Sequence, residues 1–235
     1  MCVKTFVIAE IGSCHENSLD TAYNLILTAK TSGANAVKAQ YWSSSKRLAE
    51  RRNIPAAEPI YAKYKIPLEW LEKLSTHAEK VGIEFMCSTY LPQDIGVVAP
   101  YVQKFKVSAF ENDWEEFVNA HPKGKPIIIS NRLDSKVRWL GQPYQRLHVV
   151  SEYPTPLGNL GLRRGLYQSS GNDGISLHCP DVRVGAWAVC AGAKIIEAHI
   201  KLEDTEENNP DYPHSFDTIH FREFVGNIRD AEVAL

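Results

Sequence analysis

Two histidines each end a short apolar run in the second half of the chain. His178 ends the run 174–178 and His199 ends the run 193–199, and both runs have the composition of buried parallel strands. The stretch 184–192 between them is small and apolar and ends in glycine, as a helix with a glycine stop does. Consecutive parallel strands end on one rim, so the two imidazoles can share one metal ion. We therefore predict that both are metal ligands; two unrelated polar residues at strand ends would give the same spacing.

Two lysines interrupt apolar, strand-like runs earlier in the chain. Lys38 lies within 36–40 and Lys106 lies within 104–108, positions at which a solvated side chain is unusual. A lysine ammonium is a point charge suited to phosphate oxygens, and neighbouring hydroxyl groups can complete the binding shell. The pattern predicts a site for a small polyanion.

Short apolar runs alternate with longer amphipathic ones along the whole chain. The predicted strands cover 5–10, 34–40, 83–87, 104–108, 126–130, 146–150, 174–178 and 193–199. The predicted helices cover 19–32, 68–81, 93–99, 113–120, 160–169, 182–191 and 218–234, and the segment 134–144 is too short and irregular for a helix. Eight strands with connections, in a chain of 235 residues, indicate a single (β/α)₈ TIM barrel domain over 1–235. A doubly wound open sheet is the alternative, because periodicity does not report closure.

Polar residues recur where the predicted strands end, which is where active sites of such barrels lie. They are Glu10, Lys38, Gln40, Thr89, Lys106, Glu111, Ser130, Ser151, Tyr153, Ser176, His178, Glu197 and His199. Glu10 and Glu111 can transfer protons or hold hydroxyl groups. Glu197 fits either this site or a strand-end salt bridge, and His15 fits either the site or a turn. His77, His121 and His220 are expected on exposed helix surfaces.

The bulk composition is that of an ordinary globular protein. The formal net charge is −2, with 44% hydrophobic and 23% charged residues, so no nucleic-acid or membrane partner is predicted. The five cysteines show no CxxC spacing and are expected to be reduced. The first residues lead directly into a strand without a secretory signal, so a cytoplasmic location is expected.

Several segments resemble, in order, the sialic acid synthases, the N-acetylneuraminate synthase family. They are FVIAEIG at 6–12, CHEN at 14–17, AVKAQY at 36–41, GIEFMCST at 82–89, GKPIIIS at 124–130, SEYPTP at 151–156 and IEAH at 196–199. The first segment and SEYPTP are fairly specific, and the resemblance covers almost the whole chain.

The resemblance implies a barrel enzyme that condenses phosphoenolpyruvate with an N-acyl amino sugar such as N-acetylmannosamine, giving a sialic or other nonulosonic acid and phosphate. A divalent ion, Mn²⁺ or Mg²⁺, would activate the sugar aldehyde. By motif, His178 and His199 would hold the metal, with Glu10 near it. The residues that would bind phosphoenolpyruvate are Lys38, Thr89, Lys106, Ser130, Ser151 and Ser176. Those that would face the sugar are Gln40, Glu111, Tyr153 and Asp211.

The chain also departs from the family pattern. The family usually continues into an antifreeze-like domain whose arginine reaches the partner subunit's sugar site, whereas this chain stops at Leu235; the barrel alone is expected, with a homo-oligomer left open. Asn131-Arg132 replaces Thr-Gly, and Phe110 replaces a glycine and should reshape the sugar side. The alternatives are therefore a metal-dependent barrel with a different aldehyde acceptor, and a non-catalytic barrel that binds a sugar or phosphate.

Overall fold

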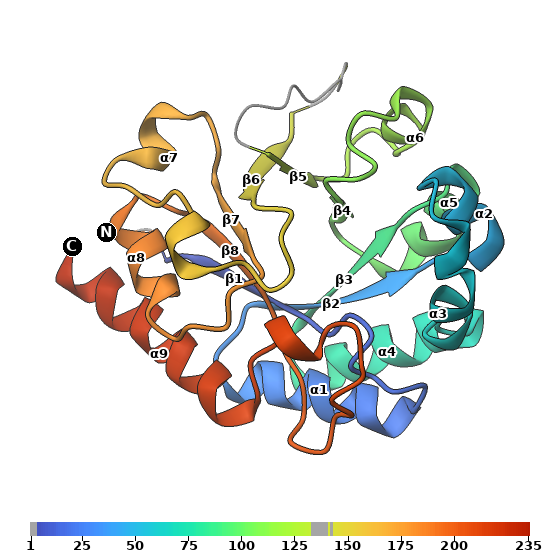
Figure 1. Cartoon of the computed structure of the whole chain (residues 1–235), viewed down its shortest axis with the longest axis horizontal. Coiled ribbons are helices and arrows are strands. Elements are labelled where there is room, and N and C mark those ends of the chain that lie inside the picture. The colour runs from blue at the N-terminus through green and yellow to red at the C-terminus, as the bar shows by residue number, and fades with distance from the viewer. Residues whose placement is uncertain (1–3, 133–140, 142) are drawn as a thin grey trace.

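The strands of the chain form one closed parallel barrel. The computed structural model describes residues 4–132, 141 and 143–235. The strands pair in sequence order and close between the first and the last (Figure 1). They are β1 Phe6–Glu10, β2 Ala36–Tyr41, β3 Glu84–Thr89, β4 Phe105–Val107, β5 Ile127–Asn131, β6 Gln145–Val149, β7 Gly174–Leu177 and β8 Ile195–His199. The predicted (β/α)₈ barrel is confirmed, and the open-sheet alternative is wrong.

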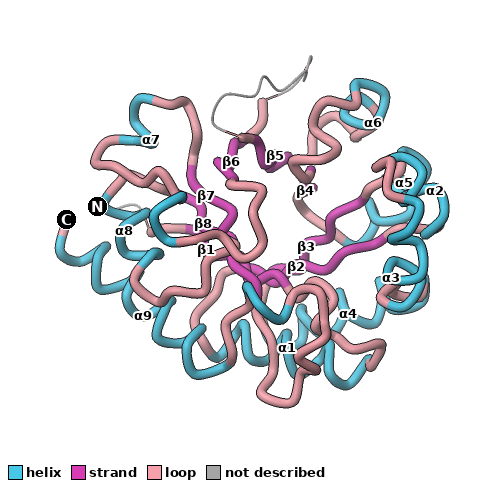
Figure 2. Tube along the Cα trace, in the orientation of Figure 1, coloured by secondary structure: helices cyan, strands magenta, loops and turns pink. Residues whose placement is uncertain are grey.

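Helices surround the strands (Figure 2). They are α1 Leu19–Thr31, α2 Ser45–Arg51, α3 Glu58–Lys63, α4 Leu68–Val81, α5 Pro92–Val98, α6 Glu115–Asn119, α7 Leu166–Ser169, α8 Val184–Cys190 and α9 Thr218–Ala234. The sequence did not predict α2 or α3. The helix predicted over 160–169 forms only at its end, because Gly161 and Gly165 take left-handed φ angles of 64° and 73° that interrupt helical backbone. Most of the segment 134–144 lies outside the described residues.

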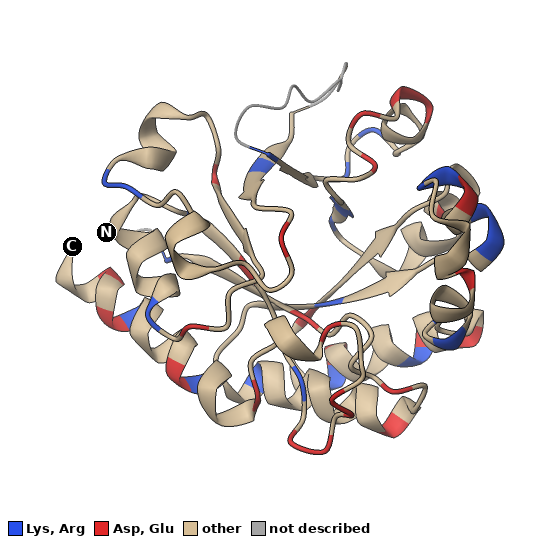
Figure 3. Ribbon diagram, viewed as in Figure 1, with Lys and Arg blue, Asp and Glu red and all other residues tan. Residues whose placement is uncertain are grey.

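Helix ends follow local chemistry. Ser18 accepts a hydrogen bond from Thr21 N at 3.2 Å and starts α1, and Asp217 accepts one from His220 N at 2.9 Å and starts α9. Acidic and basic positions are interspersed along the outer helices (Figure 3). Among the described residues, no helix is long and apolar enough to cross a membrane.

Strand alternation divides the barrel interior into two zones. Side chains at even positions of β1 and β2 face inward, whereas their neighbours Val7, Ala9 and Val37 pack against the helices. The inward residues near the start of the strands form an apolar floor, made of Ile8, Ala36, Met86, Ile128, Leu147 and Ile195. The next inward residues along the strands are polar. Among them, Glu10 lies in register with Lys38, and Ser176 lies in register with Glu197. The barrel is thus closed at one end and carries charged side chains at the other.

Candidate active site

A cavity of about 230 Å³ opens at the carboxyl end of the strands. Ten of the predicted site residues line it: Glu10, Lys38, Gln40, Lys106, Ser130, Tyr153, Ser176, His178, His199 and Asp211. Thr89, Glu111 and Ser151 do not line it. Its volume lies just below the range of about 300–1,000 Å³ typical of ligand pockets, which suits small substrates.

A layer of buried charged side chains of both signs lies at the base of this cavity, above the apolar floor of the barrel. Lys38 forms an ion pair with Glu10, and its Nζ lies 3.5 Å from Glu197 Oε2. Lys106 Nζ lies 3.6 Å from Glu197 Oε1. Glu197 therefore joins the two lysines, and Ser176 Oγ donates a hydrogen bond to its Oε1 at 2.8 Å. Of the two roles left open for Glu197, the pocket position is the one observed, and the carboxylate also makes the salt bridges.

Hydroxyl groups complete the surroundings of both lysines. Lys38 Nζ donates to Ser88 Oγ at 3.0 Å, and Lys106 Nζ donates to Ser130 Oγ at 2.7 Å. On β3 the inward residue is Ser88, whereas Thr89 is fully buried on the opposite side of the strand. Ser151 lies beside the cavity and accepts a hydrogen bond from Arg132 Nε at 3.3 Å.

The four charged groups at the base of the cavity, Glu10, Lys38, Lys106 and Glu197, have different pKa shifts. Burial raises the pKa of Glu10, despite the opposing charge of Lys38. Burial opposes charge on Lys38, but Glu10 and Glu197 outweigh it and raise the pKa of that lysine. Burial lowers the pKa of Lys106 to about 8, against the attraction of Glu197. For Glu197 the two lysines outweigh burial and lower the pKa to about 2. Of the two carboxyl groups of this cluster, Glu10 is therefore protonated more readily than Glu197.

Three imidazole rings lie together on one side of the cavity. The ring centres of His178 and His199 are 5.3 Å apart, and that of His214 lies 4.6 Å from His199 and 5.5 Å from His178. Burial lowers the pKa of His178 to about 4 and that of His199 well below its ordinary value. Both are therefore neutral at pH 7, the form that binds metals. Nδ1 of each has no hydrogen-bond partner within the described part of the chain. The residues present thus fit a divalent metal ion.

Asp211 lies between two of these rings. Its Oδ2 accepts hydrogen bonds from Ser13 N at 2.7 Å and from Ser13 Oγ at 2.9 Å. Its Oδ1 lies 3.3 Å from His214 Nε2, and its Oδ2 lies 3.9 Å from His199 Nδ1. The sequence analysis did not identify His214; its position three residues after the predicted Asp211 is the signal that could have found it.

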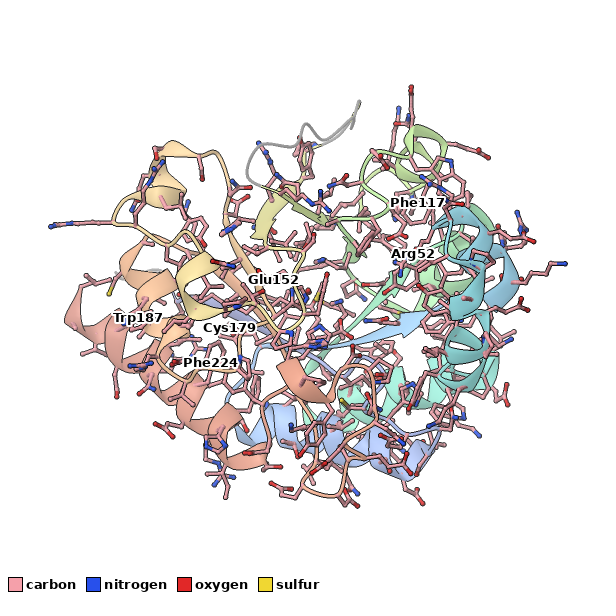
Figure 4. The ribbon with its side chains drawn as sticks, viewed as in Figure 1. Arg52, Phe117, Glu152, Cys179, Trp187 and Phe224 are labelled. Atoms are coloured by element: carbon pink, nitrogen blue, oxygen red, sulfur yellow. The ribbon has the colours of Figure 1, made fainter. Side chains whose placement is uncertain are left out.

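The opposite side of the cavity is aromatic and carries a guanidinium group. Arg52 follows α2 (Figure 4), and Trp42, Tyr61, Tyr90 and Phe110 line this side with it. The Arg52 guanidinium carbon lies 4.9 Å from the ring centre of Tyr90 and 5.0 Å from that of Phe110. The sequence analysis expected Phe110 to reshape this side but did not identify Arg52.

Glu111 is fully buried behind Arg52. Arg52 donates to its two oxygens from Nε at 2.9 Å and from Nη2 at 3.1 Å, and Ser108 also hydrogen-bonds to it. Because both oxygens are occupied, the polar group that faces the cavity here is Arg52 rather than the predicted Glu111.

The remaining histidines lie outside the cavity. His15 is buried, and its Nε2 lies 3.2 Å from Tyr64 O, so it has a structural position near the first loop. The surface position expected for His121 is wrong: it is 4% exposed and packs edge-on against Phe105 and Phe117. His220 has the expected exposed position.

The fold and the cavity define a (β/α)₈ barrel whose pocket, at the carboxyl end of the strands, carries lysines, carboxylates and imidazoles. The chain belongs to the NeuB family, whose profile matches residues 25–235.

Similar proteins cover nearly the whole chain. A pseudaminic acid synthase of Campylobacter jejuni is 27% identical over 99% of this chain and 75% of its own length. An N,N'-diacetyllegionaminic acid synthase of Legionella pneumophila is 29% identical over 98% of this chain and 73% of its own length. The crystal structure of an N-acetylneuraminic acid synthetase from Leptospira borgpetersenii, in complex with citrate, has a TM-score of 0.83 and 21% identity over 98% of this chain and 85% of that chain. This structural similarity supports the fold.

Proposed function

We propose that this protein condenses phosphoenolpyruvate with an N-acyl amino sugar aldehyde to give a nonulosonic acid and phosphate. The observation that carries the proposal is the pair of buried lysines, each hydrogen-bonded to a serine, beside neutral imidazoles at one rim. The relatives named as synthases of such acids support the same chemistry.

The lysine side of the pocket suits phosphoenolpyruvate. Lys38 and Lys106 would bind its phosphate and carboxylate oxygens, and Ser88 and Ser130 would donate further hydrogen bonds. Ser176 also lines this part of the pocket and would contact the ligand once its hydroxyl group turns away from Glu197. The resemblance also assigns Thr89 and Ser151 to this ligand. Thr89 would act indirectly, from the opposite side of β3, and Ser151 would act from outside the cavity lining. Glu197 lies between the two lysine ammonium groups and fixes their positions before the ligand binds.

The aromatic side of the pocket suits the acceptor sugar. Phe110 would pack against the acyl group, while Arg52 and Gln40 would donate to sugar oxygens. Tyr153, whose ring centre lies 4.2 Å from that of His178, would contact the sugar from the imidazole side. Glu111 would act by fixing Arg52, and Asp211 would act at the edge next to the imidazoles.

The reaction balances with water as the only further reactant. The enol carbon of phosphoenolpyruvate forms a bond to the aldehyde carbon, water adds at the adjacent carbon, and the bond to the phosphate oxygen breaks. The water oxygen becomes the ketone oxygen of the product; one of its protons leaves with phosphate, and the other restores the proton that Glu10 gives up. Glu10, with its raised pKa, would donate the proton to the former aldehyde oxygen. A divalent ion such as Mn²⁺ or Mg²⁺, held by His178 and His199, would supply Lewis-acid polarisation of that oxygen.

Phosphate release from phosphoenolpyruvate tests this function. We expect release that requires both a divalent ion and one member of a panel of N-acyl amino sugars that includes N-acetylmannosamine. Lys106→Met should lower kcat/KM for phosphoenolpyruvate about 100-fold, because a charge-assisted contact contributes about 1.5–3 kcal/mol. Lys104→Met is the matched control, since Lys104 precedes the same strand but pairs with Glu84 at 2.8 Å, outside the cavity.

Two other results would contradict the proposal. Phosphate release with a simple aldehyde but with none of the amino sugars would indicate a different acceptor. Binding of phosphoenolpyruvate without release under any condition would indicate a non-catalytic barrel.

A further inference from the structure

His214 is a buried imidazole that packs against other aromatic rings but has a ring nitrogen left unpartnered by the described residues. It ends the short 3₁₀ helix Tyr212–His214 and is 3% exposed. Its Nδ1 has no hydrogen-bond partner within the described ranges. A buried polar nitrogen without a partner is costly and uncommon in folded proteins. The position of this imidazole therefore needs a reason.

Potential ligand atoms converge at His214. One side-chain atom each of His199, Asp211 and His214 lie within 4.8 Å of one another. Two of the pairs are shorter: His214 Nε2 lies 3.3 Å from Asp211 Oδ1, and His199 Nδ1 lies 3.9 Å from Asp211 Oδ2. With bonds of about 2.1 Å, neighbouring ligand atoms around one ion lie about 3.0–3.5 Å apart. The separation between His214 and Asp211 already lies in that range, and the separation between His199 and Asp211 lies slightly above it.

One of the three ring separations lies in the range expected for rings that share an ion, and the other two lie just above it. An imidazole centre lies about 3.2 Å from an ion bound through one nitrogen, so two such centres are about 4.5–5.2 Å apart at octahedral to tetrahedral angles. The three ring centres of His178, His199 and His214 are 4.6, 5.3 and 5.5 Å apart.

The backbone around these residues is fixed. A Cβ atom at Gly12, whose φ is +46°, would lie 2.0 Å from Asp211 Oδ2 and 3.3 Å from His199 Nδ1, so the close approach requires glycine. Ser13 holds the Asp211 carboxylate through two hydrogen bonds. Lys201 Nζ donates to Tyr212 O at 2.9 Å and holds the 3₁₀ helix in place. Such supporting contacts are typical of groups that orient metal ligands.

We propose that His214 is a third imidazole ligand of the metal ion, together with His178, His199 and Asp211. The proposal deepens the proposed function, since it places the ion in the same pocket and extends its ligand set. Three imidazoles and one carboxylate favour a transition-metal ion such as Co²⁺ or Zn²⁺, whereas Mg²⁺ prefers oxygen ligands. The site should therefore bind Co²⁺ and Zn²⁺ more tightly than Mg²⁺.

Metal binding to the metal-free full chain tests the proposal without turnover. We expect one equivalent of Co²⁺ to produce visible absorption, and Co²⁺ or Zn²⁺ to raise the unfolding temperature by more than Mg²⁺ at the same concentration. His214→Ala and His214→Gln should each weaken Co²⁺ binding at least about tenfold and change the absorption spectrum. His220→Gln is the control, because His220 lies on the surface of α9 with its side chain 58% exposed. Unchanged affinity and spectrum in a folded His214 variant would overturn the proposal, leaving His214 as a hydrogen-bond partner of Asp211.

A second measurement decides the question if neither variant folds. In the wild-type protein with ¹⁵N-labelled histidine, Zn²⁺ should shift the ring nitrogens of three histidines; shifts in two or fewer would refute a third imidazole. Because these readouts need no substrate, a failure of phosphate release would reject the proposed function and leave this result standing.

Discussion

At the scale of single residues, Lys38 and Lys106 lie on the same rim of the barrel but have pKa values shifted in opposite directions. Lys38 contacts two carboxylates, whereas Lys106 lies near Glu197 at 3.6 Å and donates to an uncharged serine. Burial therefore lowers the pKa of Lys106 to about 8, because the attraction of Glu197 offsets it only in part. Between about pH 8 and its ordinary pKa, this lysine is neutral in the free protein, so its attraction for a phosphate group is lost as pH rises through 8.

We therefore expect kcat/KM for phosphoenolpyruvate to fall as pH rises through about 8. Lys106→Arg keeps its charge at these pH values and should move the fall to higher pH. Initial rates at subsaturating phosphoenolpyruvate, measured from about two pH units below this pKa to about two above it, give both profiles. Identical profiles would show that another group sets the pH dependence.

Arg52 and Glu111 allow a second prediction, on the acceptor side. Glu111→Gln removes the charge that fixes Arg52 through contacts of 2.9 and 3.1 Å. KM for the sugar should rise about tenfold or more while KM for phosphoenolpyruvate stays near its wild-type value, and the free energy of unfolding should fall by about 2–4 kcal/mol. Asp113→Asn is the control, because Asp113 lies two residues away with its side chain 71% exposed. An equal rise in both KM values would argue against a specific role on the acceptor side.

At the scale of elements, strand periodicity predicted the cavity well because a strand has only two faces. An inward position such as Lys38 or Ser176 follows from the period of two along a strand, because the neighbouring residues Val37 and Ile175 pack outward against the helices. The same rule selects Ser88 over Thr89, a distinction that the resemblance did not make. Residues that reach the cavity from short helices and loops have no such rule. Arg52 and Tyr61 belong to the segment around α2 and α3, which are seven and six residues long, too short for a clear helical period.

The packing of α8 on α9 gives a prediction about one glycine. A Cβ atom at Gly185 would lie 2.6 Å from Ile228 Cγ1 and 2.7 Å from Phe224 Cε2; Phe224 is labelled in Figure 4. Gly185→Ala should therefore lower the free energy of unfolding by about 1–3 kcal/mol through overpacking. Gly226→Ala is the matched control, because a Cβ atom at Gly226, within α9, would have no described atom of another element within 4 Å; it should raise stability by about 0.5–1 kcal/mol. Chemical unfolding of both variants measures the difference, and equal effects would contradict the packing argument.

At the scale of the whole molecule, the count of eight strands was visible in the sequence, whereas closure was not. Closure depends on the pairing of β1 with β8, which runs from Phe6 opposite Ile195 to Glu10 opposite His199, and no local pattern encodes a contact across that sequence distance. Contacts between segments that are distant in the sequence also bury several histidines. His121 was expected on a helix surface because its burial depends on Phe105, from a different strand.

These interior histidines determine how the stability of the barrel depends on pH. Burial lowers the pKa of His148 to about 4, below the value of about 6.5 expected in the unfolded chain. Between these values the unfolded chain binds more protons, so the free energy of unfolding falls as pH drops from about 6.5 towards about 4. For His148 this loss is about 1–2 kcal/mol between about pH 7 and about pH 5.

His148→Gln should remove this part of the pH dependence, whereas His220→Gln should keep it, because His220 is exposed. Urea unfolding of the metal-free protein at about pH 7 and about pH 5 measures the difference for each variant. His148 Nδ1 lies 3.3 Å from the hydroxyl group of Tyr167, so the variant will also lose a contact that is independent of pH. The test is therefore the difference in the free energy of unfolding between the two pH values, and not the stability at either one. If His148→Gln showed the same difference as the wild-type protein, the pKa of His148 would not differ between the folded and unfolded chains.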